Sequence, residues 1–174
     1  MKFTANISRF EESEIYWTSI IIIPNEIYQE MIKIAPDKRI ICTINKSLTF
    51  HCGMNPKKTF HYIMIGKDKI KTLNLEIHDE ISVEIFPDKS EFGMNVCEEL
   101  QEVLFSDPDG NSLFEKLTPG KKRGLIYVIS KVKNPELRIE KSFVLLEHLK
   151  RNKGKFDNIL FQEDCRNFRE QNSF

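Results

Sequence analysis

The sequence has no net charge, no long apolar run and no apolar leader segment. In its 174 residues, 26 Lys and Arg balance 26 Asp and Glu. A chain without excess positive charge is not expected to coat nucleic acid by bulk electrostatics. No apolar run approaches the roughly 18 residues that a membrane-spanning helix needs, and the N-terminus becomes polar within a few residues instead of forming the apolar core of a signal peptide. We therefore expect no membrane insertion and a cytoplasmic location.

The sequence also lacks the cysteine spacing of a metal or redox site. Its four cysteines are Cys42, Cys52, Cys97 and Cys165. No two of them form a C-x-x-C pair, which excludes a zinc ribbon and a thioredoxin-like site. His51, Cys52 and His61 are further candidate ligands, but neighbours in a strand point to opposite faces and the remaining two are too few for closed zinc coordination. We expect reduced thiols packed as small apolar side chains, no metal and no cofactor.

No residue pattern indicates a catalytic centre. The chain has no nucleophile elbow, and Gly66 and Gly93 are isolated instead of forming a phosphate-binding loop. Trp17 lies in an apolar segment, which favours a place in the core. His148 follows Glu147 near an expected helix end, where we interpret it as a helix-end cation and not a catalytic base.

The first half of the chain has the period-2 alternation of β-strands. Strands are expected over residues 3–7, 15–23, 39–44, 48–52, 60–65 and 80–86. The run Ile20–Ile23 predicts a strand covered on both faces. A short helix with Ile27, Met31 and Ile34 on its apolar face is expected next. Several short strands with one small helix predict a small closed or partly open β-barrel.

The second half has helical periodicity. A turn is expected over residues 106–110. Thr118-Pro119 and Asn134-Pro135 each have the pattern of an N-cap followed by proline at the first helical position. The helix after Asn134 is expected to bury the residues Ile139, Phe143 and Leu146 and to end near Gly154. The predicted fold class is α+β, with a small N-terminal β-barrel over residues 1–90 and a helical region with a C-terminal tail over residues 91–174.

Two further features of the helical region concern its contacts. Phe156, Phe161 and Phe168 indicate that the tail docks onto this chain or onto a second copy. Residues 91–115 contain seven acids and no Lys or Arg, whereas residues 116–155 contain 12 bases and three acids. The zero net charge is therefore the sum of two opposed blocks.

The basic block permits two interpretations. Lys121, Lys122 and Arg123 share the first turn of an expected helix, where the positive end of the helix dipole disfavours cations. Either the acidic block pairs with the basic block and the rest is solvated, or the basic block binds an anion, a phosphate group or nucleic acid. Tyr127 is the only aromatic residue between Lys116 and Phe143, so a base-stacking platform is not indicated.

Two sets of residues resemble known families. The first set resembles the β-barrel domain of unknown function DUF1905, through Phe3, Trp17, the apolar run before Pro24, Arg39–Asn45, Lys71-x-Leu73 and Asp79-x-x-x-Val83. The second is similar to the bacteriocin-protection family, also called YdeI or OmpD-associated, through Glu98-Glu99-Leu100, Phe114-x-x-Leu117-Thr118-Pro119-Gly120-Lys121-Lys122-Arg123, Lys131-x-Lys133 and Arg138-Ile139. Together they cover about residues 2–155. Lys46 and His78 stand where the first family has a turn glycine, which puts the geometry of both turns in question.

The resemblance implies a bacterial protein that protects against bacteriocins or antimicrobial peptides, and it supplies no catalytic residues. We predict a ligand site in a cleft between barrel and helices, lined by Arg39, Lys122, Arg123 and Arg138. The first interpretation is a non-enzymatic binding protein for an anionic small molecule or a protein partner. The second is a nucleic-acid-binding regulator that uses the basic helices of residues 116–155, and the third is an enzyme with an unrecognised site. The oligomeric state is not indicated.

Overall fold

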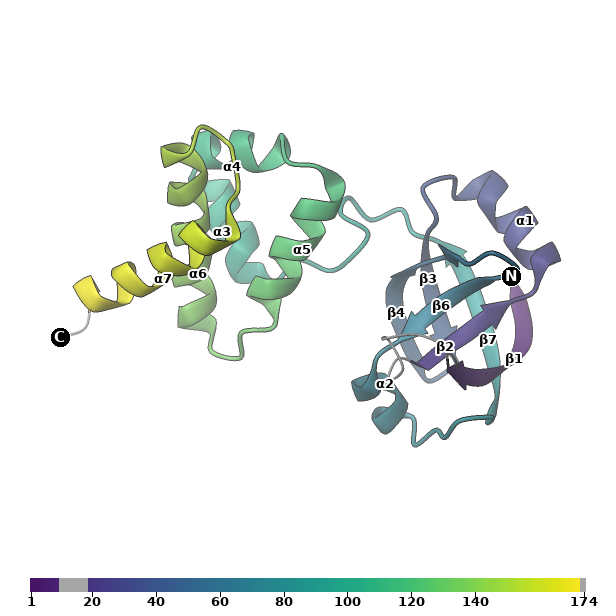
Figure 1. Ribbon diagram of the computed structural model, residues 1–174. Helices are drawn as coiled ribbons and strands as arrows, with labels where there is room; N and C mark the ends of the chain where they lie inside the picture. Colours follow the sequence, from purple (N-terminus) through teal and green to yellow (C-terminus); the bar gives the residue numbers. More distant parts are fainter. Residues whose placement is uncertain (10–18, 173–174) are drawn as a thin grey trace. The chain divides into compact units, whose positions relative to one another are not determined.

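The computed structural model describes residues 1–9 and 19–172 (Figure 1). The chain divides into two compact units, Met1–Met94 and Asn95–Phe174, which we call the barrel domain and the helical domain. The first unit contains the strands and two helices, and the second contains helices alone among its described residues. The predicted α+β class, with a barrel followed by helices, is confirmed.

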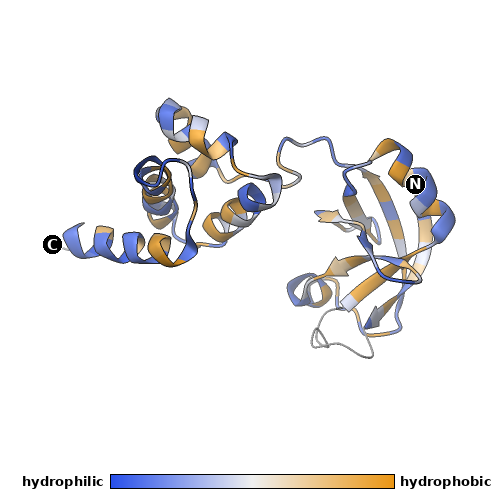
Figure 2. Ribbon diagram, turned by 45° about the horizontal axis from the view of Figure 1, so that its top comes forward, coloured by the Kyte–Doolittle hydropathy of each residue, from blue (hydrophilic) through white to orange (hydrophobic). Residues whose placement is uncertain are grey.

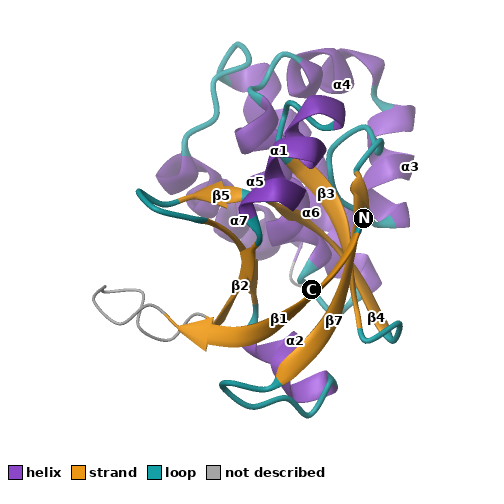
Figure 3. Ribbon diagram, turned by 90° about the vertical axis from the view of Figure 1, so that its right-hand side faces the viewer, coloured by secondary structure: helices purple, strands orange, loops and turns teal. Residues whose placement is uncertain are grey.

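The strands of the barrel domain form one antiparallel sheet in the order β4-β3-β7-β1-β2-β6-β5 (Figure 3). Their bounds are β1 Lys2–Arg9, β2 Ser19–Ile23, β3 Arg39–Ile44, β4 Leu48–Gly53, β5 Asn55–Pro56, β6 His61–Ile65 and β7 Glu80–Pro87. Strand β4, at one end of this order, contacts β6, near the other end. The sheet therefore curls into a nearly closed barrel.

Alternating apolar residues fill the barrel (Figure 2). In β7 the side chains of Ile81, Val83 and Ile85 are buried, and in β3 every second residue is buried. Burying one such side chain contributes about 1.5–3 kcal/mol, so these strands supply most of the stability of the domain. Helix α1 (Asn25–Ile34) packs against this core, and the short helix α2 (Lys67–Thr72) precedes β7.

Two apolar faces differ from expectation. Ile22 is 39% exposed, so the strand over the isoleucine run is not covered on both faces at every position. In α1, Tyr28 and Met31 are buried, whereas Ile34 is 56% exposed. The helix turns Tyr28 inward because its ring stacks on that of His61, with the ring centroids 3.3 Å apart. Residues 15–18, including Trp17, lie outside the described residues.

Both turns that lack a glycine keep a positive-φ geometry. The Ser47 N–H donates to the Ile44 carbonyl at 2.9 Å and closes a turn whose central residues, Asn45 and Lys46, have φ of 50° and 54°. Positive φ at both central positions is the combination of a type I′ turn. His78 has φ of 77°, and its N–H donates to the Ile7 carbonyl at 2.8 Å. The surrounding strands thus impose the geometry on side chains that disfavour it.

The helical domain contains α3 Glu98–Ser106, α4 Pro108–Glu115, α5 Pro119–Ser130, α6 Pro135–Arg151 and α7 Asn158–Asn172. Helix α6 contacts each of the other four helices. Its residues Leu145, Leu146 and Leu149 are fully buried, as are Phe114 of α4 and Phe161 of α7. None of the helices in the described part of the chain is long and apolar enough to span a membrane.

Three helices of this domain begin with a polar N-cap followed by proline. The predicted caps are confirmed: Thr118 accepts a hydrogen bond from the Lys121 N–H, and Asn134 accepts one from the Glu136 N–H at 2.8 Å. The turn expected over residues 106–110 is wrong, because Asp107 alone separates α3 from α4 and caps α4 through the Gly110 N–H at 3.0 Å. An Asp-Pro pair is a helix start as well as a turn signal.

The apolar face expected for α6 is rotated. Ile139 and Phe143 are 40% and 43% exposed, whereas Ser142 and Leu145 are fully buried. Apolar residues occur on several sides of this helix, so more than one face fits the spacing of a buried stripe.

The end of α6 and the tail are close to expectation. Gly154 has φ of 80°, and its N–H donates to the Leu149 carbonyl at 2.7 Å, which is the 6→1 bond of a Schellman end. In the tail, Phe161 is 1% exposed and Phe156 packs on His148, whereas Phe168 is 38% exposed. The tail therefore docks onto its own chain through α7.

Replacing Lys46 with glycine is expected to raise the free energy of unfolding by up to about 1 kcal/mol. An L-residue in the left-handed region is strained by about 1–2 kcal/mol, and glycine relieves this strain but adds entropy to the unfolded chain. Lys58→Gly, at an exposed loop position without positive φ, is the matched control and is expected to lower the free energy of unfolding by about 0.4–1 kcal/mol. Urea unfolding measures both variants, and destabilisation by both would contradict the assignment of strain to Lys46.

Two helix glycines are expected to respond oppositely to alanine. A Cβ on Gly110 would lie 2.8 Å from the Leu146 Cβ and 2.6 Å from the Asp107 carboxylate, whereas one on Gly124 meets nothing within 4 Å. Gly110→Ala should destabilise the protein by about 1–3 kcal/mol through overpacking of α4 against α6. Gly124→Ala should stabilise it by up to about 1 kcal/mol through helix propensity. Thermal unfolding distinguishes them, and equal shifts would refute the close approach of α4 to α6.

Candidate anion-binding site

The acidic and basic blocks meet in three ion pairs within the helical domain. The Lys150 Nζ lies 2.9 Å from Asp107 Oδ2. Arg138 pairs with Glu99, and Lys122 pairs with Glu115. The interpretation that the two blocks pair with each other is confirmed for these carboxylates. These contacts tie α3 and α4 to α5 and α6.

Arg138 holds three segments together. Its guanidinium donates to Glu99 and, through Nη1, to the Val132 carbonyl at 3.1 Å. The hydrogen bond with Arg138 holds the pKa of Glu99 below its ordinary value, and the same bond raises the pKa of Arg138. Two of the four predicted site cations, Arg138 and Lys122, are thus engaged with carboxylates of the same domain.

The other two predicted cations have different surroundings. Arg39 begins β3 in the barrel domain, and its Nη2 donates to the Gly93 carbonyl at 2.6 Å. It therefore anchors the chain that follows β7. Arg123 lies half-buried in α5. A shared cleft site for Arg39, Lys122, Arg123 and Arg138 stays a prediction.

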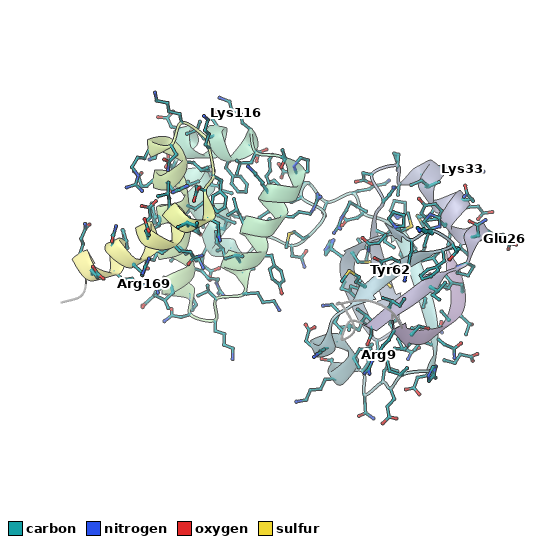
Figure 4. The ribbon with its side chains drawn as sticks, viewed as in Figure 1. Arg9, Glu26, Lys33, Tyr62, Lys116 and Arg169 are labelled. Carbon is teal, nitrogen blue, oxygen red and sulfur yellow. The ribbon has the colours of Figure 1, made fainter. Side chains whose placement is uncertain are left out.

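Three other lysines of the basic block converge on one hollow of the helical domain. Its volume is about 590 Å³, and it is lined by Lys116, Leu117, Thr118, Lys121, Asn152, Gly154, Lys155, Phe156, Asp157 and Leu160. Lys116 precedes α5 and lies beside the link between α6 and α7 (Figure 4). Lys121 belongs to the first turn of α5, and Lys155 to that link. We call this hollow the lysine pocket.

The lysine pocket combines two sources of positive potential. It lies at the N-terminus of α5, where the helix dipole gives a partial positive charge. Three ammonium groups add to it, against the single carboxylate of Asp157. That carboxylate is already bonded to the N–H groups of Ile159 and Leu160 at 2.9 and 3.0 Å, where it caps α7. The pocket therefore favours an anion.

A smaller apolar hollow adjoins the lysine pocket. It has a volume of about 240 Å³ and is lined by Lys121, Gly124, Leu125, Val128, Phe156, Asn158 and Phe161. Lys121 and Phe156 line both hollows. A ligand with an anionic group and a small apolar part can therefore occupy both.

Comparison with known proteins bears on this domain. Residues 94–152 match the family model described as Bacteriocin-protection, YdeI or OmpD-Associated. This range, which holds helices α3 to α6, is therefore similar to that family. The resemblance stated for the C-terminal pattern is confirmed over this range, and the barrel that precedes it fits the expected β-barrel domain. No curated protein matches the chain.

The bacteriocin-protection match covers only part of the lysine pocket. Lys116 and Lys121 lie within it, whereas Lys155 and all of α7 follow its end. Sequence reasoning noted Lys121, with Lys122 and Arg123, as a cation in an unfavourable helix first turn, but did not count it among the four predicted site residues. It missed the convergence with Lys116 and Lys155, because only the docking of the α6–α7 link brings these segments together.

His148 of the helical domain lies in the last turn of α6, as expected, but it is fully buried there. Its Nδ1 lies 2.7 Å from Asp164 Oδ2, and the Asp157 backbone N–H donates to its Nε2 at 3.2 Å. Both ring nitrogens are therefore held by contacts within the domain, which indicates a structural role. Sequence spacing did not show that α7 covers this end of α6.

The barrel domain holds a second histidine–carboxylate contact. His51 Nδ1 lies 2.8 Å from Asp88 Oδ2, and the Ser90 N–H and Oγ donate to Asp88 at 2.9 and 2.6 Å. Burial acts to raise the pKa of Asp88, but the hydrogen bonds from Ser90 and His51 outweigh it and hold the pKa below its ordinary value. His61 stacks on Tyr28 instead of joining His51.

The four cysteines are free, and two of them have thiols that are held protonated. Cys42 and Cys165 are buried. A hydrogen bond with Cys42, together with burial, raises the pKa of the Cys52 thiol, and burial raises that of Cys165. Within residues 1–9 and 19–172, no three His, Cys, Asp or Glu side chains gather as metal ligands. The expected absence of a metal or cofactor stays a prediction.

Asp107 is expected to stabilise the helical domain through both its cap and its charge. Asp107→Ala should lower the free energy of unfolding by about 1 kcal/mol through loss of the α4 cap. Asp107→Asn keeps a capping oxygen, so it should cost less and remove only the attraction to Lys150.

The charge of Asp107 also predicts that the free energy of unfolding falls in acid. The Gly110 N–H and then Lys150 hold the pKa of Asp107 below its ordinary value. Its charge therefore contributes stability above about pH 4, and this contribution is lost as the pH falls through the lower pKa of the folded state. Urea unfolding at several pH values should show the wild type and Asp107→Asn converging in acid. A difference that stays constant down to pH 2 would contradict the assignment.

Proposed function

We propose that this is a bacterial, cytoplasmic binding protein of the bacteriocin-protection type that takes up an anionic ligand in the lysine pocket. The observation that carries the proposal is the convergence of Lys116, Lys121 and Lys155 on a hollow at the N-terminus of α5. Its volume of about 590 Å³ falls within the range of small-molecule sites. The barrel domain, of the DUF1905 type in this proposal, is a second folded unit attached to the binding domain.

The ligand in this proposal has a phosphate or carboxylate head and a small apolar part. Backbone N–H groups at a helix start and nearby ammonium groups are the usual donors to such a head. Leu117, Phe156 and Leu160 provide apolar wall, and the adjoining hollow beside Gly124 accepts the rest of the ligand.

Binding without catalysis is supported by the state of the reactive groups. The pKa of the Cys52 and Cys165 thiols is raised, which disfavours the thiolate that a nucleophile needs. Both His51 and His148 are fixed on carboxylates. The alternative of a nucleic-acid-binding regulator loses support because Lys122, Arg138 and Lys150 of the basic block are paired within the domain.

Titration calorimetry with inorganic pyrophosphate tests the lysine pocket. Lys121→Gln/Lys155→Gln should weaken binding by about tenfold or more, because two of the three ammonium groups are lost. Lys131→Gln/Lys133→Gln removes the same charge at exposed positions outside the pocket and should change affinity by less than about threefold. An equal loss of pyrophosphate affinity in both double variants would show that only net charge matters, and would refute binding in the lysine pocket.

A gel shift with duplex DNA at 50 and 200 mM salt separates the nucleic-acid alternative. A regulator that contacts several phosphates should bind at low salt and lose affinity steeply as the salt rises. Pyrophosphate binding with no shift supports the small-ligand proposal. A salt-sensitive shift that Lys131→Gln/Lys133→Gln abolishes would favour the nucleic-acid reading instead.

A further inference from the structure

A second surface of the helical domain has the opposite charge and an apolar floor. It is a hollow of about 410 Å³ between α3 and α6, lined by Glu98, Glu99, Glu102, Val103, Ser106, Ile139 and Phe143. None of its lining residues belongs to the lysine pocket. We call it the acidic groove.

The floor of the acidic groove is built from large side chains that the domain leaves in solvent. Ile139 and Phe143 are 40% and 43% exposed and stand four residues apart on α6, so they lie one above the other on one face. Phe143 also lines a neighbouring hollow of about 400 Å³, together with Phe168, which is 38% exposed. The apolar strip therefore continues from α6 onto α7, and a contiguous exposed strip of this kind indicates an interaction surface.

The rim of the groove carries more carboxylates than paired cations. Glu98 and Glu102 stand four residues apart on α3 and form no ion pair with any residue in the described ranges, whereas Glu99 is paired with Arg138. Like charges at this spacing repel each other slightly, and a cation supplied by a partner would offset this repulsion.

We propose that the acidic groove docks a cationic amphipathic helix. In this arrangement the apolar side chains of the partner helix lie on Ile139 and Phe143, and its Lys or Arg side chains, spaced by one turn, reach Glu98 and Glu102. This is the helix-in-groove mode of recognition, in which apolar anchors provide affinity and charge selects the partner. It is independent of the lysine pocket, which has the opposite charge and separate lining residues.

The charge of the rim also decides against two other occupants. A symmetric contact between two copies brings the same surface together, so the carboxylates of this rim would lie near those of the other copy. An anionic membrane surface would repel the same carboxylates. A cationic helix removes the repulsion that both of these would add.

Fluorescence anisotropy with a labelled 18-residue helix of Leu and Lys, arranged with one apolar and one cationic face, tests the proposal on the full chain. The same peptide with Glu in place of Lys is the peptide control. The Lys peptide should bind, and the Glu peptide should bind at least tenfold more weakly. Equal binding of the two peptides would refute the role of the acidic rim.

Two pairs of variants locate the contact. Glu98→Lys/Glu102→Lys should weaken binding by tenfold or more, whereas Glu26→Lys/Glu30→Lys makes the same change at the same spacing in exposed positions of α1 and should leave it within about twofold. Phe143→Ala should also cost tenfold or more. Phe86→Ala, at a 46% exposed phenylalanine of the barrel domain, should have no effect.

Three further measurements separate the outcomes. Circular dichroism should show unchanged helix content in all four variants, so that loss of binding is not loss of fold. Lys121→Gln/Lys155→Gln should bind the Lys peptide normally, which separates this proposal from the lysine pocket. Light scattering should give the same mass for the wild type and Phe143→Ala; a wild-type dimer that this variant converts to monomer would assign the groove to self-association and overturn the proposal.

Discussion

The arrangement of the helical domain depends on ion pairs between its acidic helices, α3 and α4, and its basic helices, α5 and α6. Glu99, Asp107 and Glu115 each meet a cation of the segment that follows. Partly exposed ion pairs of this kind contribute at most about 1 kcal/mol each, so they do not supply most of the stability. Their effect is on register: each fixes which turn of α3 or α4 faces which turn of α5 or α6. The buried contacts of Phe114, Leu145 and their neighbours then supply the energy.

Because this pairing is incomplete, two groups of charged side chains, one positive and one negative, remain without an ion pair to any described residue, at different places in the domain. Lys116, Lys121 and Lys155 remain around the start of α5, and Glu98 and Glu102 remain on α3. If every acidic residue were paired with a basic one, neither the lysine group nor the glutamate group would remain. The zero net charge of the chain conceals this separation, since the sum over all residues says nothing about which charges face one another.

The local elements could be predicted from the sequence, and the tertiary faces could not. Thr118-Pro119 and Asn134-Pro135 begin helices as expected, because a cap and a fixed proline φ are decided within four residues. The buried face of α6 was misplaced at Ile139 and Phe143, because this helix is apolar on several sides and only its neighbours decide which side is covered. The residues of the lysine pocket could not be predicted for the same reason. The sequence showed that Lys121 stands in a helix first turn, which disfavours cations, but Lys155 lies beside it only because the tail docks there. The burial of His148 was not predicted either, since Asp157 and Asp164 reach it from beyond the end of its own helix.

The tail completes a pocket that the family-matched segment alone does not form. Residues 94–152 contain α3 to α6, but Phe156, Asp157 and Leu160, which complete the lysine pocket, follow that range. The buried His148 holds them in place, because its Nε2 accepts the backbone N–H of Asp157 while its Nδ1 is fixed on Asp164 of α7. One imidazole therefore links the end of α6, the connecting chain and α7, and the walls of the pocket depend on that link. A change in the tail can alter the shape of the pocket while the helices of the matched segment stay the same.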